Sequence, residues 1–252
     1  MSIPKKIHYC WFGKGELPTL AIKCINSWKK FCPDYEIILW DENSFDINSN
    51  TYVKEAYESK KYAFVTDYVR LYALYNFGGI YMDTDVEVIK NLDDFLQYDG
   101  FSGFETETTV PTGIMASVKG TQLLYQLLEY YDNRHFVIDG EFDTTTNVEI
   151  ITKIFIEKGL KANNSFQCIE GFSLFPKDFF CPKNYQDGQI YLTSNTVTIH
   201  HFSGSWQSRE LKKATYLIRK YGKKIGSLLY VGWLAIYSHD ELLNMLKRKV
   251  KK

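Results

Sequence analysis

Two carboxylates one residue apart follow a short apolar run just after a glycine pair. The segment GGIYM at residues 78–82 leads into Asp83 and Asp85. Because successive side chains of a strand point to opposite faces, both carboxylates share one face if the backbone stays extended between them. Carboxylate oxygens suit Mg²⁺ or Mn²⁺, which keep open positions for substrate phosphates such as those of a nucleotide diphosphate. The pair therefore predicts a divalent-cation site, although the same pattern also occurs in solvated turns.

The segment before the glycine pair predicts a helix over residues 61–77. Its apolar residues recur at spacings of three and four, and Gly78 ends the helix. Asp67 and Arg70 lie three residues apart and are neighbours on the helix surface. They form either an ordinary intrahelical ion pair or a site for a sugar hydroxyl and a phosphate. We favour the second interpretation, because charges on a largely buried aromatic helix need partners and this helix leads into the two carboxylates.

The first forty residues predict the elements that position these groups. Residues 6–13 predict a strand that ends in a loop, and a helix over 20–31 and a second strand over 35–40 follow in that order. This order favours a parallel α/β sheet, because parallel neighbours need a crossover of such a length. Ligands of open α/β sheets bind beyond the carboxyl ends of the strands, where Trp11, Asp41 and the carboxylate pair fall. No dinucleotide-binding or P-loop glycine motif occurs.

The composition is that of an ordinary globular chain. Its 252 residues are 45% hydrophobic and 24% charged, which is enough for one large domain with its own core. Five cysteines without a CxxC pair favour reduced thiols rather than a disulfide framework. The N-terminal residues contain no apolar signal core. We therefore expect a cytoplasmic protein.

Positive charge gathers towards the C-terminus, although the net charge of the chain is zero. Residues 210–252 contain eleven Lys or Arg against three Asp or Glu, a net charge of +8, which leaves −8 for the remainder. Residues 225–237 are mostly apolar but too short to span a bilayer, which takes about twenty residues. We expect a basic helical extension that either packs on the main domain or rests on an anionic membrane at its inner face. Nucleic acid is a poor partner, because no binding motif accompanies the charge.

The middle of the chain is interpreted mainly as scaffold. Residues 110–116 predict a loop into a strand beneath the ligand, and residues 120–132 predict an amphipathic helix. Asn147 is expected to cap a helix that starts near Val148. No local feature separates an acceptor-binding role for Asp143 from that of a loop charge.

Four segments in this order together resemble the signature of glycosyltransferase family 32. They are residues 3–13 (IPKKIHYCWFG), 63–70 (AFVTDYVR), 78–85 (GGIYMDTD) and 200–206 (HHFSGSW). That family includes bacterial capsule and polysaccharide transferases and yeast mannosyltransferases, and its catalytic core is similar to that of the large clostridial glucosylating toxins. The resemblance implies an α/β fold of the GT-A type, with a mostly parallel central sheet flanked by helices, over residues 1–208. The basic helical extension then occupies residues 209–252.

The resemblance also implies roles for individual residues. Trp11 would stack on the nucleobase, Asp67 would hold hydroxyls of the donor sugar or ribose, and Arg70 would reach the sugar or diphosphate. Asp85 would bind the metal directly, whereas Asp83 would act through water or the ribose. The further residues implied for the donor or the metal are Tyr81, His201, Gly204, Ser205 and Trp206.

The two adjacent histidines leave one choice open. A strand over residues 196–199 precedes them, so His200 and His201 point to opposite faces and at most one faces the metal. We choose His201 to complete the metal shell on its spacing to Gly204, with His200 as the alternative. By the same resemblance, Trp206 would close over the diphosphate from a mobile loop. Imidazole beside carboxylates favours Mn²⁺ over Mg²⁺.

These features predict a metal-dependent glycosyltransferase. It would move a sugar from a nucleotide diphosphate sugar, preferably a UDP-sugar, to a saccharide or lipid-linked saccharide acceptor. The resemblance implies retention of the anomeric configuration and a role in bacterial surface, or capsular, polysaccharide synthesis. One alternative is a metal-dependent nucleotidyltransferase or phosphohydrolase, which would more often need a second carboxylate cluster. The other alternative is a module that binds a nucleotide sugar without turnover.

Overall fold

The computed structural model describes residues 2–111, 113–185 and 187–204, together with residues 213, 214, 216–218, 220, 221, 225 and 227–231. The chain divides into two compact units. The larger unit comprises residues 1–183 and 190–203, and the smaller unit comprises residues 184–189 and 204–252. The expected boundary after residue 208 stays a prediction, and most of the expected basic extension lies outside the described residues.

Within the described residues of the larger unit, seven strands form one sheet in the order β2-β1-β3-β6-β5-β10-β9. Their bounds are β1 (Lys6–Cys10), β2 (Glu36–Trp40), β3 (Gly79–Met82), β5 (Gly100–Gly103), β6 (Ile114–Ser117), β9 (Gln167–Ile169) and β10 (Phe172–Phe175). Strand β1 pairs in parallel with β2 and β3, and β5 pairs in parallel with β10. Strands β6 and β9 run against their neighbours. Five of these seven strands share one direction, so the expected mostly parallel sheet is confirmed.

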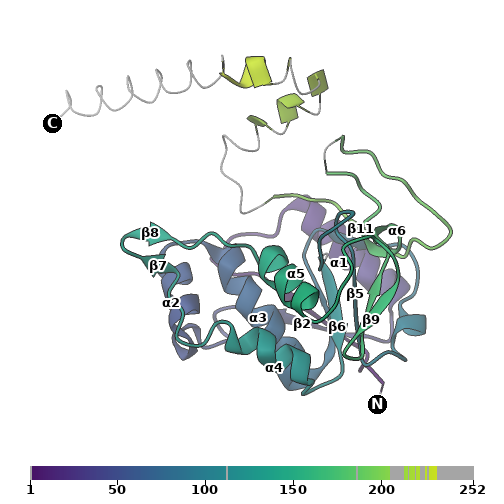
Figure 1. Ribbon diagram of the computed structural model, residues 1–252, viewed down its shortest axis with the longest axis horizontal. Helices are drawn as coiled ribbons and strands as arrows, with labels where there is room; N and C mark the ends of the chain where they lie inside the picture. The colour runs from purple at the N-terminus through teal and green to yellow at the C-terminus, as the bar shows by residue number, and fades with distance from the viewer. Residues whose placement is uncertain are drawn as a thin grey trace. The chain divides into compact units, whose positions relative to one another are not determined.

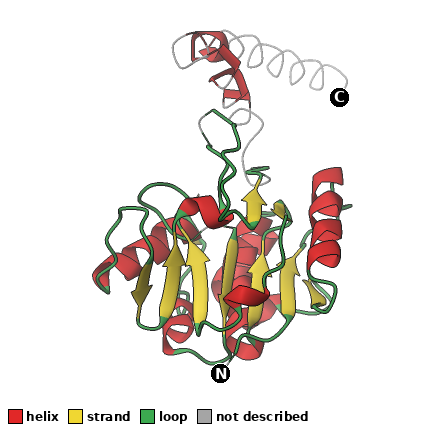
Figure 2. Ribbon diagram, turned by 90° about the vertical axis from the view of Figure 1, so that its right-hand side faces the viewer, coloured by secondary structure: helices red, strands yellow, loops and turns green. Residues whose placement is uncertain are grey.

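Two hydrophobic cores lie on the two faces of this sheet. Tyr81 belongs to one core, whereas its neighbours Ile80 and Met82 belong to the other, as the alternation of side chains along a strand requires. The first core includes residues of α2 (Thr51–Glu58), α3 (Tyr62–Phe77), α4 (Gln122–Glu129) and α5 (Asn147–Glu157). The second includes residues of α1 (Thr19–Phe31), η2 (Asp93–Phe95) and α6 (Lys177–Phe180). Helices therefore flank both faces (Figure 1, Figure 2), which confirms the expected α/β fold with helices around a central sheet.

The glycine pair turns the chain from α3 into β3. Helix α3 begins one residue later than expected and ends at Phe77 as expected, and the N–H of Gly78 donates to the carbonyl oxygen of Leu74. Gly78 has φ +63° and Gly79 has φ +113°, conformations that residues with a Cβ rarely adopt. A Cβ at Gly79 would also lie 2.9 Å from the carbonyl oxygen of Lys6 in the neighbouring strand. The pair thus allows β3 to enter the sheet directly behind the helix.

Smaller elements complete the larger unit. Strands β4 (Val86–Val88) and β11 (Thr198–His200) form an antiparallel pair, and β7 (Val137–Ile138) and β8 (Glu141–Phe142) form a hairpin. A short 3₁₀ helix, η1 (Ile47–Ser49), precedes α2. No helix among the described residues has both the length and the apolar character to cross a bilayer.

Candidate active site

Three side chains that could bind a metal meet beyond the carboxyl end of β3. Asp83 and Asp85 lie in the turn between β3 and β4, and His200 is the last residue of β11. One ligand atom from each residue lies within 4.8 Å of the others. The antiparallel register places His200 opposite Val86, so the β4–β11 pair carries the imidazole to the carboxylates. Two carboxylates and one imidazole form a ligand set that suits Mn²⁺, so these residues fit the expected cation.

The structure brings His200, rather than His201, to the carboxylates. His200 Nε2 lies 3.4 Å from Asp85 Oδ1. His201 points the other way, with its Nε2 2.8 Å from Glu87 Oε2, and Glu87 also pairs with Lys23 at 2.7 Å. The choice of His201 from its spacing to a glycine is therefore corrected to His200 as the candidate third ligand. The physical reason is the register of β11, which sets the face of the strand on which each histidine lies.

Asp85 is held as an ionised carboxylate. Its side chain is buried, and its Oδ2 accepts a hydrogen bond from the backbone N–H of Ser203 at 2.6 Å. Burial by itself raises the pKa of a carboxyl group, but the nearby His200 ring and the Ser203 N–H outweigh it and hold the pKa of Asp85 below its usual range. A carboxylate that stays charged in a buried position suits a divalent cation.

Arg70 on α3 connects two carboxylates. Its Nη2 lies 3.2 Å from Asp67 Oδ1 and 3.2 Å from Asp83 Oδ1. The guanidinium also lies over the ring of Tyr81, 4.6 Å from the ring centroid, and the Tyr81 hydroxyl donates to Asp83 Oδ1 at 3.0 Å. The intrahelical ion pair considered from the sequence is thus present. Arg70 also pairs with Asp83, one of the candidate metal ligands. Helix α3 and strand β3 together place four of the expected residues in one connected group.

Asp67 is a largely buried carboxylate, with its side chain 14% exposed, and its surroundings contain unsatisfied polar groups. Burial raises its pKa to about 6, against the opposing effect of Arg70. Asn147 lies beside it, with Nδ2 3.4 Å from the Asp67 carbonyl oxygen. Among the described residues, Asn147 Oδ1 and the Tyr131 hydroxyl are buried without a hydrogen-bond partner. Because unpaired buried polar atoms are costly, these atoms mark a place where ligand hydroxyls would be favoured.

The expected role of Asn147 as a helix cap is wrong. Thr146 is the N-cap of α5, and its hydroxyl accepts from the Glu149 N–H while the Glu149 side chain accepts from the Thr146 N–H. Asn147 is the first residue inside the helix, and its side chain turns inward, with the residue 4% exposed. The Thr-x-x-Glu spacing of a capping box was the sequence signal that could have freed Asn147 for the site.

Gly113 is a second residue that sequence reasoning missed. Its carbonyl oxygen accepts the N–H of Asp83 at 2.8 Å. A Cβ at this position would lie 2.8 Å from Val86 Cγ2 and 3.2 Å from both Asp83 Oδ2 and His200 Cδ2. The absence of a side chain therefore leaves room for two of the candidate ligands. A glycine directly before a buried strand was the available signal, since such positions often mark a close approach of other groups.

Trp11 lies at the carboxyl end of β1, as expected. Its backbone N–H donates to the carbonyl oxygen of Trp40 at the end of β2, and its indole N–H donates to that of Gly15. The indole is half-buried, and no ring contact with it is found among the described residues. Asp41, which also follows a strand, instead accepts the N–H groups of Asn43 and Ser44 and so forms a turn.

The last expected segment is described only in part. Ser205 and Trp206 lie outside the described residues. Gly204 has φ +59° and belongs to the smaller unit. The donor-binding roles of these three residues stay predictions.

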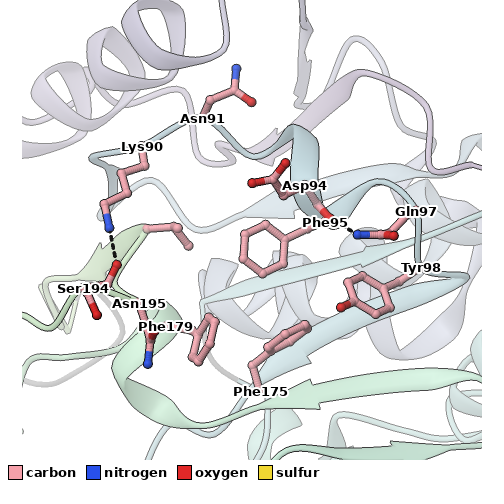
Figure 3. Close-up of a pocket in the computed structure, with 11 residues that line it drawn as sticks. Lys90, Asn91, Asp94, Phe95, Gln97, Tyr98, Phe175, Phe179, Ser194 and Asn195 are labelled. Carbon is pink, nitrogen blue, oxygen red and sulfur yellow. Dashed lines mark hydrogen bonds between the residues drawn. The ribbon is translucent and has the colours of Figure 1, made fainter.

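A pocket of about 550 Å³ lies elsewhere in the larger unit (Figure 3). Phe95, Phe175 and Phe179 contribute aromatic rings to it, and none of the expected site residues lines it. Its polar side chains are bonded locally, since Lys90 Nζ donates to the Ser194 carbonyl oxygen and the Gln97 amide donates to that of Asp94. We therefore take the group of Asp83, Asp85 and His200, and not this pocket, as the candidate active site.

Comparisons with known proteins agree with this placement. A family model described as a glycosyltransferase sugar-binding region containing a DXD motif matches residues 18–102, which include Asp67, Arg70, Asp83 and Asp85. The chain is 31% identical over 143 residues to inositol phosphoceramide mannosyltransferase 3 of Schizosaccharomyces pombe. This match covers 54% of this chain and 40% of that protein, so the chain spans less than half the length of this relative.

Two further similarities cover more of the chain. It is 27% identical over 215 residues to the uncharacterized glycosyltransferase L373 of Acanthamoeba polyphaga mimivirus, which covers 81% of this chain and 84% of that protein. A solved glycosyltransferase involved in the glycosylation of the major capsid of PBCV-1 aligns with 79% of this chain and 94% of its own, at 14% identity and a TM-score of 0.45. From the matched region, residues 18–102 are similar to the DXD-containing sugar-binding region of glycosyltransferases, and the named relatives are glycosyltransferases as well.

Proposed function

We propose that this chain is a metal-dependent glycosyltransferase that moves a sugar from a nucleotide diphosphate sugar to a saccharide or lipid-linked saccharide acceptor. The observation that carries the proposal is the meeting of Asp83, Asp85 and His200 at one point, with Arg70 bonded to Asp83. The matched sugar-binding region and the names of the relatives support the same class of reaction.

The metal ligands and Arg70 would act on the leaving group. Asp83, Asp85 and His200 would hold a divalent cation, preferably Mn²⁺, which neutralises the charge that develops on the diphosphate as the anomeric bond breaks. Arg70 provides a second positive charge beside this position. Burial acts to lower the pKa of Arg70, but the carboxylates of Asp83 and Asp67 raise it above its usual range. The guanidinium therefore keeps its charge at neutral pH.

The remaining groups would bind the other parts of the donor. Asp67 and Asn147 would form hydrogen bonds with hydroxyls of the sugar or ribose, because Asp67 is largely buried and Asn147 Oδ1 has no hydrogen-bond partner. Trp11 would stack on the base at the end of β1. Trp206, with Ser205 and Gly204, would close over the diphosphate, as the family resemblance implies.

The course of the reaction and the nature of the substrates belong to the same proposal. The resemblance implies retention by a front-face substitution in which the leaving phosphate accepts the acceptor proton, so the protein need not supply a covalent nucleophile. UDP-sugars remain our preferred donors and bacterial surface polysaccharide our preferred acceptor. The relative from S. pombe is named for transfer of mannose to inositol phosphoceramide, so a mannose donor and a lipid acceptor should be tested as well.

The alternative as a nucleotidyltransferase or phosphohydrolase is less well supported. Such enzymes often use two metal ions held by more carboxylates. Within the part of the chain that the structure describes, Asp83, Asp85 and His200 form the one group of three metal-binding side chains that was found. This is the arrangement expected for a single cation.

A donor-hydrolysis assay tests the proposal. The protein is incubated with UDP- and GDP-sugars and Mn²⁺, and release of free nucleotide and sugar is measured over time. We expect slow release that EDTA abolishes and that Asp85→Asn removes without unfolding the protein. Cleavage of plain phosphodiesters without preference for nucleotide sugars would favour a phosphohydrolase, and donor binding without release of sugar would favour a binding module.

A further inference from the structure

The ring of His200 has charged groups on two sides. Its Nε2 faces Asp85 in the candidate metal site, and its Nδ1 lies 3.5 Å from Glu105 Oε1. The ring is buried, and Nδ1 makes no hydrogen bond of ordinary geometry among the described residues. The Cys181 thiol also faces this ring, and the ring of Phe202 lies 4.2 Å away between centroids.

A neutral imidazole that binds a cation must carry its proton on the other nitrogen. Binding through Nε2 requires a lone pair there, so the proton sits on Nδ1 and needs an acceptor. Metal-bound histidines usually donate this proton to a carboxylate, a carbonyl oxygen or water, which fixes both the tautomer and the orientation of the ring. Nδ1 of His200 is the unpaired atom at which such an acceptor is required.

Glu105 is the group placed to accept that proton. It follows β5 by two residues, so the carboxyl end of a second strand of the sheet brings it to the site. Its backbone N–H donates to the Thr109 carbonyl oxygen, which holds the segment in place, and its side chain is 18% exposed. Within the described residues, His200 is the ion-pair partner found for Glu105. A carboxylate is a much stronger acceptor than the thiol of Cys181.

We propose that Glu105 is a positioning residue of the metal site: its carboxylate accepts the proton on His200 Nδ1, and this leaves the lone pair of Nε2 for the cation. The inference rests on the metal-dependent function proposed above. In this role Glu105 would touch neither the donor nor the cation. It acts through the imidazole, so its loss should weaken metal binding before it alters any step of sugar transfer.

Binding of Mn²⁺ to the protein without donor tests the proposal. Affinity is measured by titration, and the ¹⁴N coupling of bound Mn²⁺ is measured by pulsed electron paramagnetic resonance, which detects a coordinated imidazole. We expect Glu105→Ala to weaken Mn²⁺ binding by about 10- to 100-fold and to diminish the ¹⁴N coupling, as for loss of other such partners of metal ligands. Glu105→Gln keeps an acceptor oxygen, so we expect a smaller loss of affinity with the coupling retained.

Two comparisons keep the result interpretable. Glu107→Gln alters a nearby exposed glutamate that pairs with Lys177, and it should bind Mn²⁺ like the wild-type protein. Melting without metal shows whether each variant is folded, and Glu105→Gln carries the test if Glu105→Ala does not fold. Unchanged affinity and coupling in the Glu105 variants would overturn the role of Glu105 alone. A wild-type protein that binds Mn²⁺ without ¹⁴N coupling, or not at all, would overturn the metal site and this inference together.

Discussion

At the scale of single residues, the site depends on buried polar side chains and on a glycine whose lack of a side chain leaves space. Asn147 is the clearest case of the first kind, because its Oδ1 is buried without a partner next to Asp67. We expect Asn147→Ala to raise the KM for the donor by about tenfold, which corresponds to the loss of one well-formed hydrogen bond of about 1.4 kcal/mol. Steady-state kinetics with a cleaved donor measure this change. Asn195→Ala alters an exposed asparagine of the separate pocket and should leave KM as it is.

Gly113 is the case of the second kind. Its missing Cβ leaves room for Asp83 and His200, so Gly113→Ala should push both candidate ligands apart. We expect a loss of stability of about 1–3 kcal/mol, as for other overpacked positions, together with weaker Mn²⁺ binding. Denaturant unfolding and metal titration measure the two effects. Gly15→Ala is the matched control, because a Cβ there meets nothing within 4 Å. Equal Mn²⁺ affinity in Gly113→Ala and the wild type would show that Gly113 does not shape the cluster.

At the scale of elements, Glu55 on α2 fixes the β7–β8 hairpin. Its carboxylate accepts the N–H groups of Phe136 and Val137, and it lies 2.7 Å from His135 Nδ1. Burial acts to raise the pKa of Glu55, but these hydrogen bonds lower it below its usual value. A carboxylate with a lowered folded-state pKa stabilises the fold above its unfolded pKa of about 4.3, and this stability is lost as the pH falls through the folded value.

The Glu55 hydrogen bonds therefore predict a pH-dependent effect of mutation. We expect Glu55→Gln to lower the free energy of unfolding by about 1–2 kcal/mol at pH 7, because the charged acceptor is lost. The difference from the wild type should shrink as the pH falls below about 4. Unfolding curves at several pH values measure it, with Glu58→Gln as the control on an exposed position of the same helix. A difference that stays constant from pH 7 to pH 3 would contradict this account of the hairpin.

At the scale of the whole molecule, the sequence specified the sheet better than it specified the site. The helix before Gly78 and the strand after it could be predicted. The apolar residues before the glycine pair recur at the helical spacing of three and four, and a short apolar run typical of a buried strand follows the pair. The choice between His200 and His201 could not, because the register of β11 against β4 is a long-range property. Glu105 is brought in by β5 and Asn147 by α5. The capping box beside Asn147 could have excluded it as the cap, but nothing near either residue in the chain indicates the candidate metal site.

The basic segment over residues 209–252 adds one prediction at this scale. If it contacts an anionic membrane surface, the protein should co-sediment with vesicles that contain anionic lipids and not with neutral ones. Added salt should weaken this binding, because exposed charges are screened. Lys223→Glu combined with Lys224→Glu should reduce it, and donor hydrolysis in solution should stay as in the wild type. Binding that is the same for neutral and anionic vesicles would contradict the electrostatic explanation.

The central claim is that Asp85 and its neighbours hold one cation that connects the protein to the donor. The most direct measurement is the melting temperature of the wild type and of Asp85→Asn with a nucleotide sugar, each with and without Mn²⁺, since a ligand that binds the folded state raises it. We predict that the donor raises the melting temperature of the wild type only when Mn²⁺ is present, and that Asp85→Asn folds but shows no such rise. A donor-dependent rise that is equal in the two proteins, or that needs no metal, would contradict the account.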